Sequence, residues 1–317
     1  MNELTIKTLS VFNPYYLQKA QELERNKLKL VQYTSAEAAM SIISNNEVWL
    51  RNTSCMNDYS EVEHGFECLL EAFHSNTHGE KFKETINSIF PGITKKLTDL
   101  FDGWIPYFRS GTYIACVSEH PPEENKYGRL SMWRAYGGTH SVALVLNTKP
   151  FLSESDALHA YTNPVLYCDQ ENFTQQFGKL IERISTNHEF VKTLGKDATI
   201  GWLFDTFKRT VLCTKHPGFS EEREWRVIYT PDQNRSKHVT EEVKSIGGIP
   251  QIVHKIPLKD IPEEGFFGAT VAEFIDRIII GPNDQQKVLG KTFEKILENA
   301  GCQNPHTKIH YSGIPLR

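Results

Sequence analysis

Closely spaced cysteines are absent from this sequence, although it contains six cysteines. They stand singly, and no two are separated by only two residues, as the ligands of many structural zinc sites are. We therefore expect no metal and no disulfide framework. Scattered free cysteines are typical of proteins in a reducing compartment, so the cytoplasm is the predicted location.

Long apolar runs and a strong charge of one sign are also missing. No stretch approaches the roughly 18 residues that a membrane-spanning helix needs. The first residues contain no basic segment followed by an apolar one, so we expect neither a signal peptide nor a membrane partner. Lysine and arginine total 35 against 39 acidic residues, a net charge of −4, which argues against nucleic-acid binding over the whole surface. Nothing in the sequence points to an oligomeric state.

Glycine-rich nucleotide-binding motifs do not occur, because neither G-x-G-x-x-G nor G-x-x-x-x-G-K is present. What the 317 residues do contain is strand-like segments that alternate irregularly with helical ones. The strand-like segments are 28–33, 48–50, 113–117, 141–146, 164–167, 225–229, 251–253, 277–280 and 308–311. This pattern predicts a single α+β domain over residues 28–317, with mixed or antiparallel strands and helical insertions, after a helical lead-in over residues 1–27.

The most informative segment is Glu222-Arg223-Glu224-Trp225-Arg226, which leads into an apolar run. Because side chains alternate along a strand, Glu224 and Arg226 share one face and Trp225 lies on the other. A carboxylate on a rigid strand beside a loop can act as an acid, a base or an electrostatic stabiliser. Glu224, Glu222 and Arg226 are therefore the candidate catalytic residues, with Glu224 expected to contribute most. The alternative is a structural Glu-Arg pair at the start of a strand.

A second cluster, Gln32-Tyr33-Thr34-Ser35, lies where a strand is predicted to turn into a helix. Hydroxyl and backbone N–H groups at such a turn can bind a phosphate, a ribose or an amide. These four residues are candidate cofactor-binding residues. The alternative is that Thr34 and Ser35 only cap the helix, with Thr34 as the N-cap of a capping box.

A third cluster contains Trp133, Tyr136 and His140 around a Gly-Gly pair. Aromatic residues three apart, next to a tight turn, suit a flat heterocycle or a ribose, so these residues are further candidates for cofactor binding. The alternative is that the two aromatic side chains belong to the core and that the histidine is structural.

The polar loop after the second strand supplies the candidate substrate-binding residues Arg51, Asn57 and Asp58. Asp58 and Glu61 are three residues apart and share a face if they are helical, so they can bind a cation or orient a polar substrate. The alternative is a helix N-cap followed by acidic residues of the first turn.

These motifs, in this order, resemble a bacterial family called domain of unknown function 2971, over about residues 28–317. The motifs are Tyr33-Thr34-Ser35, Asn57-Asp58 with Glu61, Trp133 with Tyr136 and His140, Glu222 to Arg226, and Ser312 to Arg317. The chain departs from the family pattern where Tyr59 replaces the proline of Asn-Asp-Pro. The family name itself carries no activity.

The opening strand-Thr-helix-strand segment is also similar to the first motif of mono-ADP-ribosyltransferases that modify DNA or RNA. This resemblance implies Thr34 as an NAD contact, Gln32 at the position of a His or Arg that grips NAD, and Glu222 or Glu224 as the catalytic carboxylate. Gln32 departs from that pattern because it carries no charge. By analogy, such proteins imply a role in phage defence or as a toxin.

Three functions follow from these residues, and the first is our principal hypothesis. It is an ADP-ribosyltransferase-like enzyme that acts on NAD or a nucleotide, with NAD as substrate and a nucleic acid or a protein as a possible target. In it, Tyr33, Trp133 and Glu224 line a shared cleft. The second is a nuclease or hydrolase whose acidic residues hold Mg²⁺. The third is a ligand-sensing module without turnover.

Overall fold

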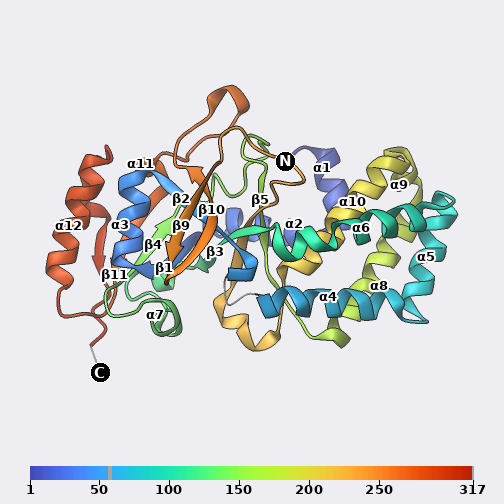
Figure 1. Cartoon of the computed structure of the whole chain (residues 1–317), viewed down its shortest axis with the longest axis horizontal. Coiled ribbons are helices and arrows are strands. Elements are labelled where there is room, and N and C mark those ends of the chain that lie inside the picture. Colours follow the sequence, from blue (N-terminus) through green and yellow to red (C-terminus); the bar gives the residue numbers. More distant parts are fainter. Residues whose placement is uncertain (56–58, 316–317) are drawn as a thin grey trace. The chain divides into compact units, whose positions relative to one another are not determined.

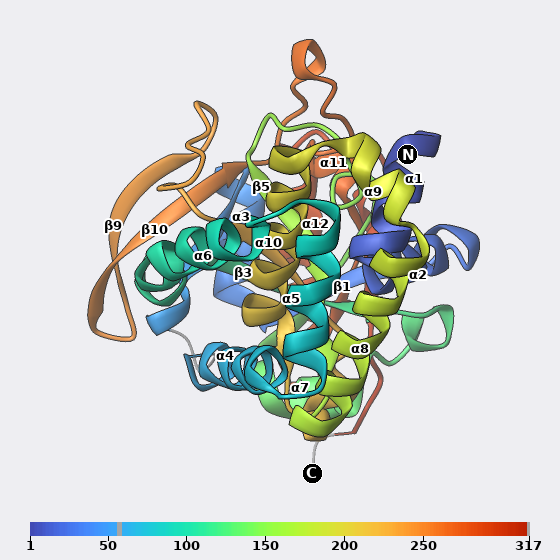
Figure 2. The ribbon, with the colours of Figure 1, turned by 90° about the vertical axis from the view of Figure 1, so that its right-hand side faces the viewer.

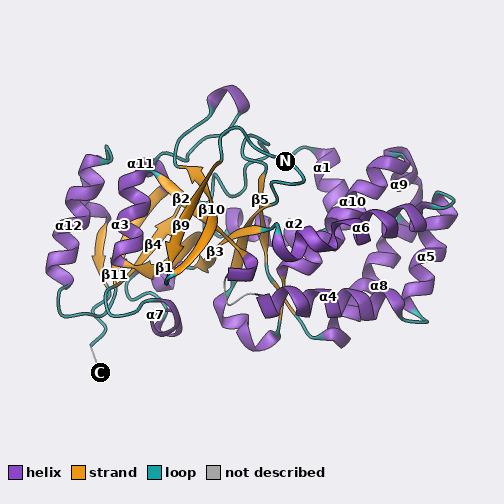
Figure 3. Ribbon diagram, in the orientation of Figure 1, coloured by secondary structure: helices purple, strands orange, loops and turns teal. Residues whose placement is uncertain are grey.

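The chain divides into two compact units in the computed structural model, which describes residues 1–55 and 59–315. Unit 1 comprises Met1–Ala20, Asn52–Thr112 and Asn163–Glu221, and unit 2 comprises Gln21–Arg51, Tyr113–Thr162 and Glu222–Arg317. Unit 1 is mainly helical, whereas unit 2 contains the large sheet, as the ribbons of Figures 1 and 3 show. The α+β class with helical insertions is therefore confirmed. The boundary at residue 27 stays a prediction.

Unit 1 is held together by helices that pack their phenylalanine side chains against each other. The rings of Phe82, Phe177 and Phe207 have centroids 5.2 to 6.3 Å apart, which is the usual spacing of packed aromatic pairs. Several of these helices can be followed in Figure 2. The elements are α1 (Glu3–Phe12), the first part of α2 (Pro14–Arg25), α4 (Tyr59–His74), α5 (His78–Ile89), α6 (Ile93–Ser110), α8 (Gln170–Thr186), α9 (His188–Leu194), α10 (Lys196–Cys213), and the parallel strands β6 (Leu166–Tyr167) and β7 (Thr214–Lys215).

Unit 2 is built on a mixed sheet with the strand order β12-β11-β4-β1-β3-β2-β10-β9, to which β8 adds through β3, and β5 through β8. The strands are β1 (Lys29–Ser35), β2 (Glu47–Asn52), β3 (Tyr113–His120), β4 (Ser141–Leu146), β5 (Ala160–Pro164), β8 (Glu224–Tyr229), β9 (Thr240–Ile246), β10 (Ile249–Pro257), β11 (Ile275–Ile280) and β12 (Ile309–Tyr311). β11 and β12 are parallel, and α12 (Gln286–Asn299) lies between them in the chain. The pairs β1–β3, β1–β4, β4–β11, β3–β8, β2–β10 and β9–β10 are antiparallel.

The core of unit 2 surrounds β4, whose six residues are all buried. A strand buried on both faces must be covered on both sides. On one face, Val31 and Ala143 pack with Met132 and Trp133 of α7 (Leu130–Tyr136). The helices α3 (Ala36–Asn45) and α12 lie next to each other, and α3 contacts β1 and β4. The short helix α11 (Val271–Phe274) leads directly into β11.

The strands predicted at 141–146 and 277–280 match β4 and β11, because long apolar segments specify buried strands. The sequence did not predict β9, because only two of its seven side chains, Val243 and Ile246, are apolar. The adjacent Gly247-Gly248, with φ of 59° and 82°, is a hairpin signal that could have revealed it. The predicted N-cap is corrected from Thr34 to Ser35, whose side chain accepts a hydrogen bond from the N–H of Ala38 at 3.1 Å.

His254 on β10 gives unit 2 a pH-dependent stability. The imidazole is 2% exposed, and its ring centroid lies 4.2 Å from that of Tyr113 and 5.1 Å from that of Tyr229. Burial lowers the pKa of His254 below its ordinary value of 6.5, although Glu241 opposes this shift. The unfolded chain therefore binds a proton at a higher pH than the folded protein does. Stability contributed by neutral His254 is present above pH 6.5 and is lost as the pH falls toward the lowered pKa.

We expect the melting temperature of the protein to fall on acidification from about pH 7 to about pH 5, the range in which histidine titrates. His254→Phe keeps an aromatic ring between the two tyrosines and removes the titrating group. The variant should consequently lose less melting temperature than the wild type over the same range, measured by circular dichroism. Equal losses in the two proteins would contradict the prediction.

Candidate functional site

The face of the sheet that carries Tyr33 also carries the predicted catalytic pair. Val31 lies opposite Ser118 in the β1–β3 ladder, and Ser118 lies opposite Glu224 in the β3–β8 ladder. Paired residues of neighbouring strands share a face, and residues two apart along one strand do so too. Glu224 and Arg226 therefore lie on the same face of the sheet as Tyr33.

Glu224 and Arg226 form a buried ion pair. Their exposed fractions are 6% and 0%. Nε of Arg226 donates to Oε1 of Glu224 at 2.7 Å, and its terminal nitrogen lies 3.5 Å from Oε2. Because a guanidinium engages both carboxylate oxygens, most of the charge of Glu224 is offset inside the unit. This geometry favours a structural role for the pair.

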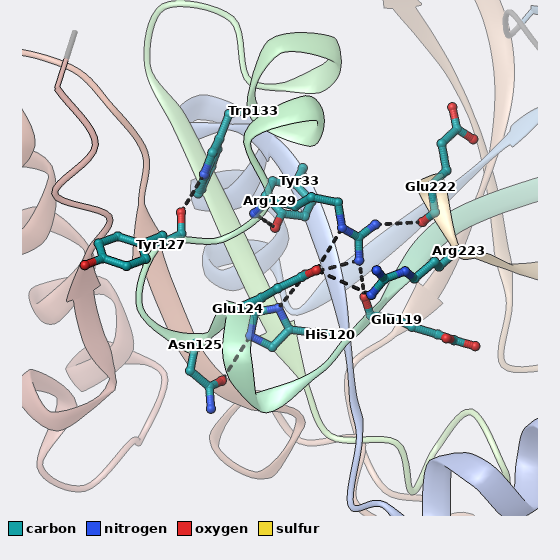
Figure 4. Close-up of polar contacts among 10 residues, drawn as sticks. All are labelled: Tyr33, Glu119, His120, Glu124, Asn125, Tyr127, Arg129, Trp133, Glu222 and Arg223. Carbon is teal, nitrogen blue, oxygen red and sulfur yellow. Dashed lines mark hydrogen bonds and ion pairs between the residues drawn. The ribbon is translucent and has the colours of Figure 1, made fainter. Parts of the chain in front are cut away.

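Arg129, at the N-terminus of α7, connects segments that are far apart in the sequence (Figure 4). Nε and NH2 donate to the two carboxylate oxygens of Glu124 at 3.0 and 3.1 Å. NH2 also donates to the carbonyl of Glu119 at 2.8 Å, and NH1 donates to the carbonyl of Glu222 at 3.2 Å. A planar guanidinium has five donors in a fixed geometry, so one side chain can fix all three segments.

Glu124, the acidic partner of Arg129, also lies close to a second arginine and to a histidine. NH1 of Arg223 lies 3.5 Å from Oε1 of Glu124. Nδ1 of His120 lies 3.9 Å from Oε2 of Glu124, and its Nε2 is 3.0 Å from Oδ1 of Asn125. Burial lowers the pKa of His120, with Asn125 and Glu124 opposing the shift, which favours the neutral imidazole. Glu124 thus serves mainly as the counter-ion of Arg129.

Tyr33 is attached to the same network through its hydroxyl. The phenolic oxygen accepts a hydrogen bond from the backbone N–H of Arg129 at 2.7 Å. Its ring meets Trp133 edge to face, with centroids 4.8 Å apart, and the Trp133 indole donates to the carbonyl of Tyr127 at 2.8 Å. Burial raises the pKa of Tyr33 to about 12, so the phenol stays protonated at neutral pH. Tyr33 and Trp133 are 7% and 5% exposed, and both belong to the core.

Tyr136 and Glu222 are the accessible members of the group. Tyr136 is 47% exposed, and its hydroxyl donates to Oε1 of Glu222 at 2.9 Å. The main-chain carbonyl of Glu222 points toward Arg129, while its side chain points away from the network, as Figure 4 shows. Glu222 therefore has a fixed backbone and a carboxylate at the surface of unit 2, next to an exposed aromatic ring.

Other predicted site residues lie elsewhere. Gln32 and Thr34 alternate with Tyr33 along β1, so their side chains lie on the opposite face from Glu224. Ser35 caps α3. Nε2 of His140 lies 3.1 Å from Oε1 of Gln285.

The predicted substrate-binding residues are on and after β2. Nε of Arg51 donates to Oε1 of Gln251 on β10 at 3.2 Å. Asn57 and Asp58 lie outside the described residues. Glu61 belongs to unit 1, where its carboxylate pairs with the buried Lys215 at 2.7 Å. The predicted role of each residue in binding stays a prediction.

Arg129, Glu124 and His120 are not among the residues predicted from the sequence, because the segment 118–130 is mostly polar and contains none of the motifs described above. An arginine between a strand and the Trp-x-x-Tyr motif is a weak signal, since only the fold shows which groups it contacts.

Within residues 1–55 and 59–315 there is no group of three His, Cys, Asp or Glu side chains that could hold a metal ion. The same part of the chain has no helix long and apolar enough to span a membrane.

Comparison with known proteins supports one of the two resemblances. Residues 132–227 match the model of a family described as "Protein of unknown function (DUF2971)". This range runs from α7 to the middle of β8, so it includes Trp133, Tyr136, Glu222 and Glu224. No curated protein and no solved structure matches the chain. The resemblance to ADP-ribosyltransferases is not shown by these comparisons.

Proposed function

We propose that this chain, whose residues 132–227 match the DUF2971 family model, is an ADP-ribosyltransferase-like enzyme that uses NAD or a related nucleotide. The observation that carries the proposal is the placement of Glu222. Its half-buried side chain lies beside the exposed ring of Tyr136, while its backbone carbonyl accepts a hydrogen bond from the buried Arg129. In this proposal Glu222, rather than Glu224, is the reacting carboxylate.

The chemistry that such a carboxylate supports is cleavage of a glycosidic bond. When the bond between nicotinamide and ribose breaks, positive charge develops on the sugar, and a fixed carboxylate stabilises it. Arg129 contributes preorganisation, because Glu222 need not move its backbone to meet that charge. The ring of Tyr136 offers a flat apolar surface for a base or a nicotinamide.

The buried groups have a supporting role in this proposal. Arg226 pairs with Glu224 inside the sheet and so fixes the first residues of β8, which begins two residues after Glu222. The hydroxyl of Tyr33 accepts a hydrogen bond from the backbone N–H of Arg129, and the ring of Trp133 packs against that of Tyr33. These contacts fix the backbone of Arg129. A rigid surrounding of this kind is what a catalytic residue on a strand end requires.

The decisive experiment follows NAD and other nucleotides in the presence of the purified full-length protein. We expect release of nicotinamide, detected by chromatography, at a rate that EDTA does not change. Binding of NAD by calorimetry without any turnover would instead support a ligand-sensing module. Turnover that EDTA abolishes and Mg²⁺ restores would support a metal-assisted hydrolase.

An acceptor macromolecule, nucleic acid or protein, would be identified from transfer of label from NAD carrying a labelled adenine. A role in phage defence or as a toxin is part of the same proposal and rests on analogy alone.

A further inference from the structure

The edge of the sheet in unit 2 is formed by β9, which pairs with β10 and is the last strand of the order. Among the described residues, no strand pairs with the outer side of β9. An edge strand presents a row of backbone N–H and C=O groups to which another strand can add. Natural proteins usually protect such edges, so the side chains along β9 are informative.

Two apolar side chains that lie opposite each other on one face of this hairpin are exposed. Val243 on β9 lies directly opposite Ile252 on β10, and the two are 68% and 41% exposed. Ile249, beside the turn and on the opposite face of β10, is 59% exposed. Val243 and Ile252 share the face of Leu50 and Ile256, which belong to a core cluster of unit 2. This face of the sheet is therefore buried at Leu50 and Ile256 and exposed at Val243 and Ile252.

The charged side chains of β9 are arranged so that the strand complements itself. Glu242 and Lys244 flank Val243. If a second copy of β9 runs antiparallel with Val243 opposite its own equivalent, Glu242 of each copy lies opposite Lys244 of the other. Opposite charges directly across an antiparallel pair stabilise it, whereas like charges destabilise it. Within one copy, Nζ of Lys244 already lies 2.5 Å from Oε1 of Glu242, so the two crossed pairs extend an existing network.

We propose that two copies of this chain associate through antiparallel pairing of their β9 strands. The contact is isologous, as expected of a symmetric dimer, and the sheet runs continuously through both copies. It joins the exposed Val243 side chains at the two-fold axis and pairs each Glu242 with the Lys244 opposite. This dimer goes beyond the proposed activity and does not depend on it, because no residue of β9 belongs to the Arg129 network.

The test is the oligomeric state in solution, measured by sedimentation velocity over a range of protein concentrations. We expect a concentration-dependent dimer for the wild type. Glu242→Lys places lysine opposite lysine at two positions, and Lys244→Glu does the same with glutamate. Each single variant should weaken dimerisation roughly tenfold or more, since two opposite-charge pairs become two repulsive ones.

The matched control is the double variant Glu242→Lys with Lys244→Glu, which restores opposite charges across the axis and should recover the dimer. Val288→Lys on α12, at an equally exposed valine (65%), should leave the dimer unchanged. Circular dichroism melts of all variants establish that each remains folded. A monomeric wild type, a dimer that neither single variant weakens, or a double variant that stays monomeric would each overturn the proposal.

Discussion

The Glu222→Gln variant is expected to lose the proposed NAD turnover by roughly 10² to 10³-fold, because removing a charge aimed at the reacting centre usually costs that much. Glutamine keeps the shape of the side chain and can still accept the hydrogen bond from Tyr136. Folding should be unaffected, since the buried contact of Glu222 is made by its backbone carbonyl. The measurement is nicotinamide release at saturating NAD, with a melting curve of the same sample.

Glu224→Gln is the matched comparison for this variant, because it makes the same chemical change two residues away on the buried strand. The variant leaves Arg226 facing an amide rather than a carboxylate, so it should be destabilised by about 1–3 kcal/mol. Activity per folded molecule should stay close to that of the wild type. If Glu224→Gln abolished turnover in a folded protein while Glu222→Gln did not, the assignment of the reacting carboxylate would have to be reversed.

Arg226→Ala is expected to destabilise unit 2 by about 3–5 kcal/mol, because it removes the guanidinium that contacts both oxygens of the buried Glu224 carboxylate. The guanidinium is fully buried, so water cannot replace it without opening the sheet. Chemical denaturation gives the free energy of unfolding directly. A loss below about 1 kcal/mol, the size of an exposed ion pair, would contradict a buried pair.

A double variant separates the ion pair from simple loss of volume. Glu224→Leu together with Arg226→Met replaces both charges by apolar side chains of similar length. Its cost should be clearly smaller than the sum of Glu224→Leu and Arg226→Met measured singly, since residues in direct contact are not additive. An additive result would mean that the two side chains act independently.

The sequence predicted the parts of unit 2 that depend on apolar patterning. β4 is almost wholly apolar and β11 ends in three consecutive isoleucines, so the position and burial of these segments follow from composition. The alternation that puts Glu224 and Arg226 on one face of β8 also follows from the strand period. The sequence alone does not show how deeply the side chains of Glu224 and Arg226 are buried, because that depends on which distant segments pack over this face.

The sequence alone therefore does not distinguish the roles of Glu222 and Glu224. Both are acidic residues of one motif, and only the fold makes one buried and the other accessible. Arg129 could not be predicted either, since its partners Tyr33 and Glu222 are 96 and 93 residues away in the chain. Short-range rules describe helices and strands well, but such long-range hydrogen bonds follow from tertiary structure.

The order in which the strands of unit 2 occur along the chain bears on how the protein emerges from the ribosome. β4 takes its two neighbours from opposite ends of the sequence, β1 near the start and β11 near the end. At roughly 5–20 residues per second, on the order of ten seconds separate the synthesis of β4 from that of β11. During this interval one edge of β4, a strand with mainly apolar side chains, has no partner strand. We therefore expect nascent chains truncated before β11 to bind chaperones, and chains extended beyond β12 to be released from them.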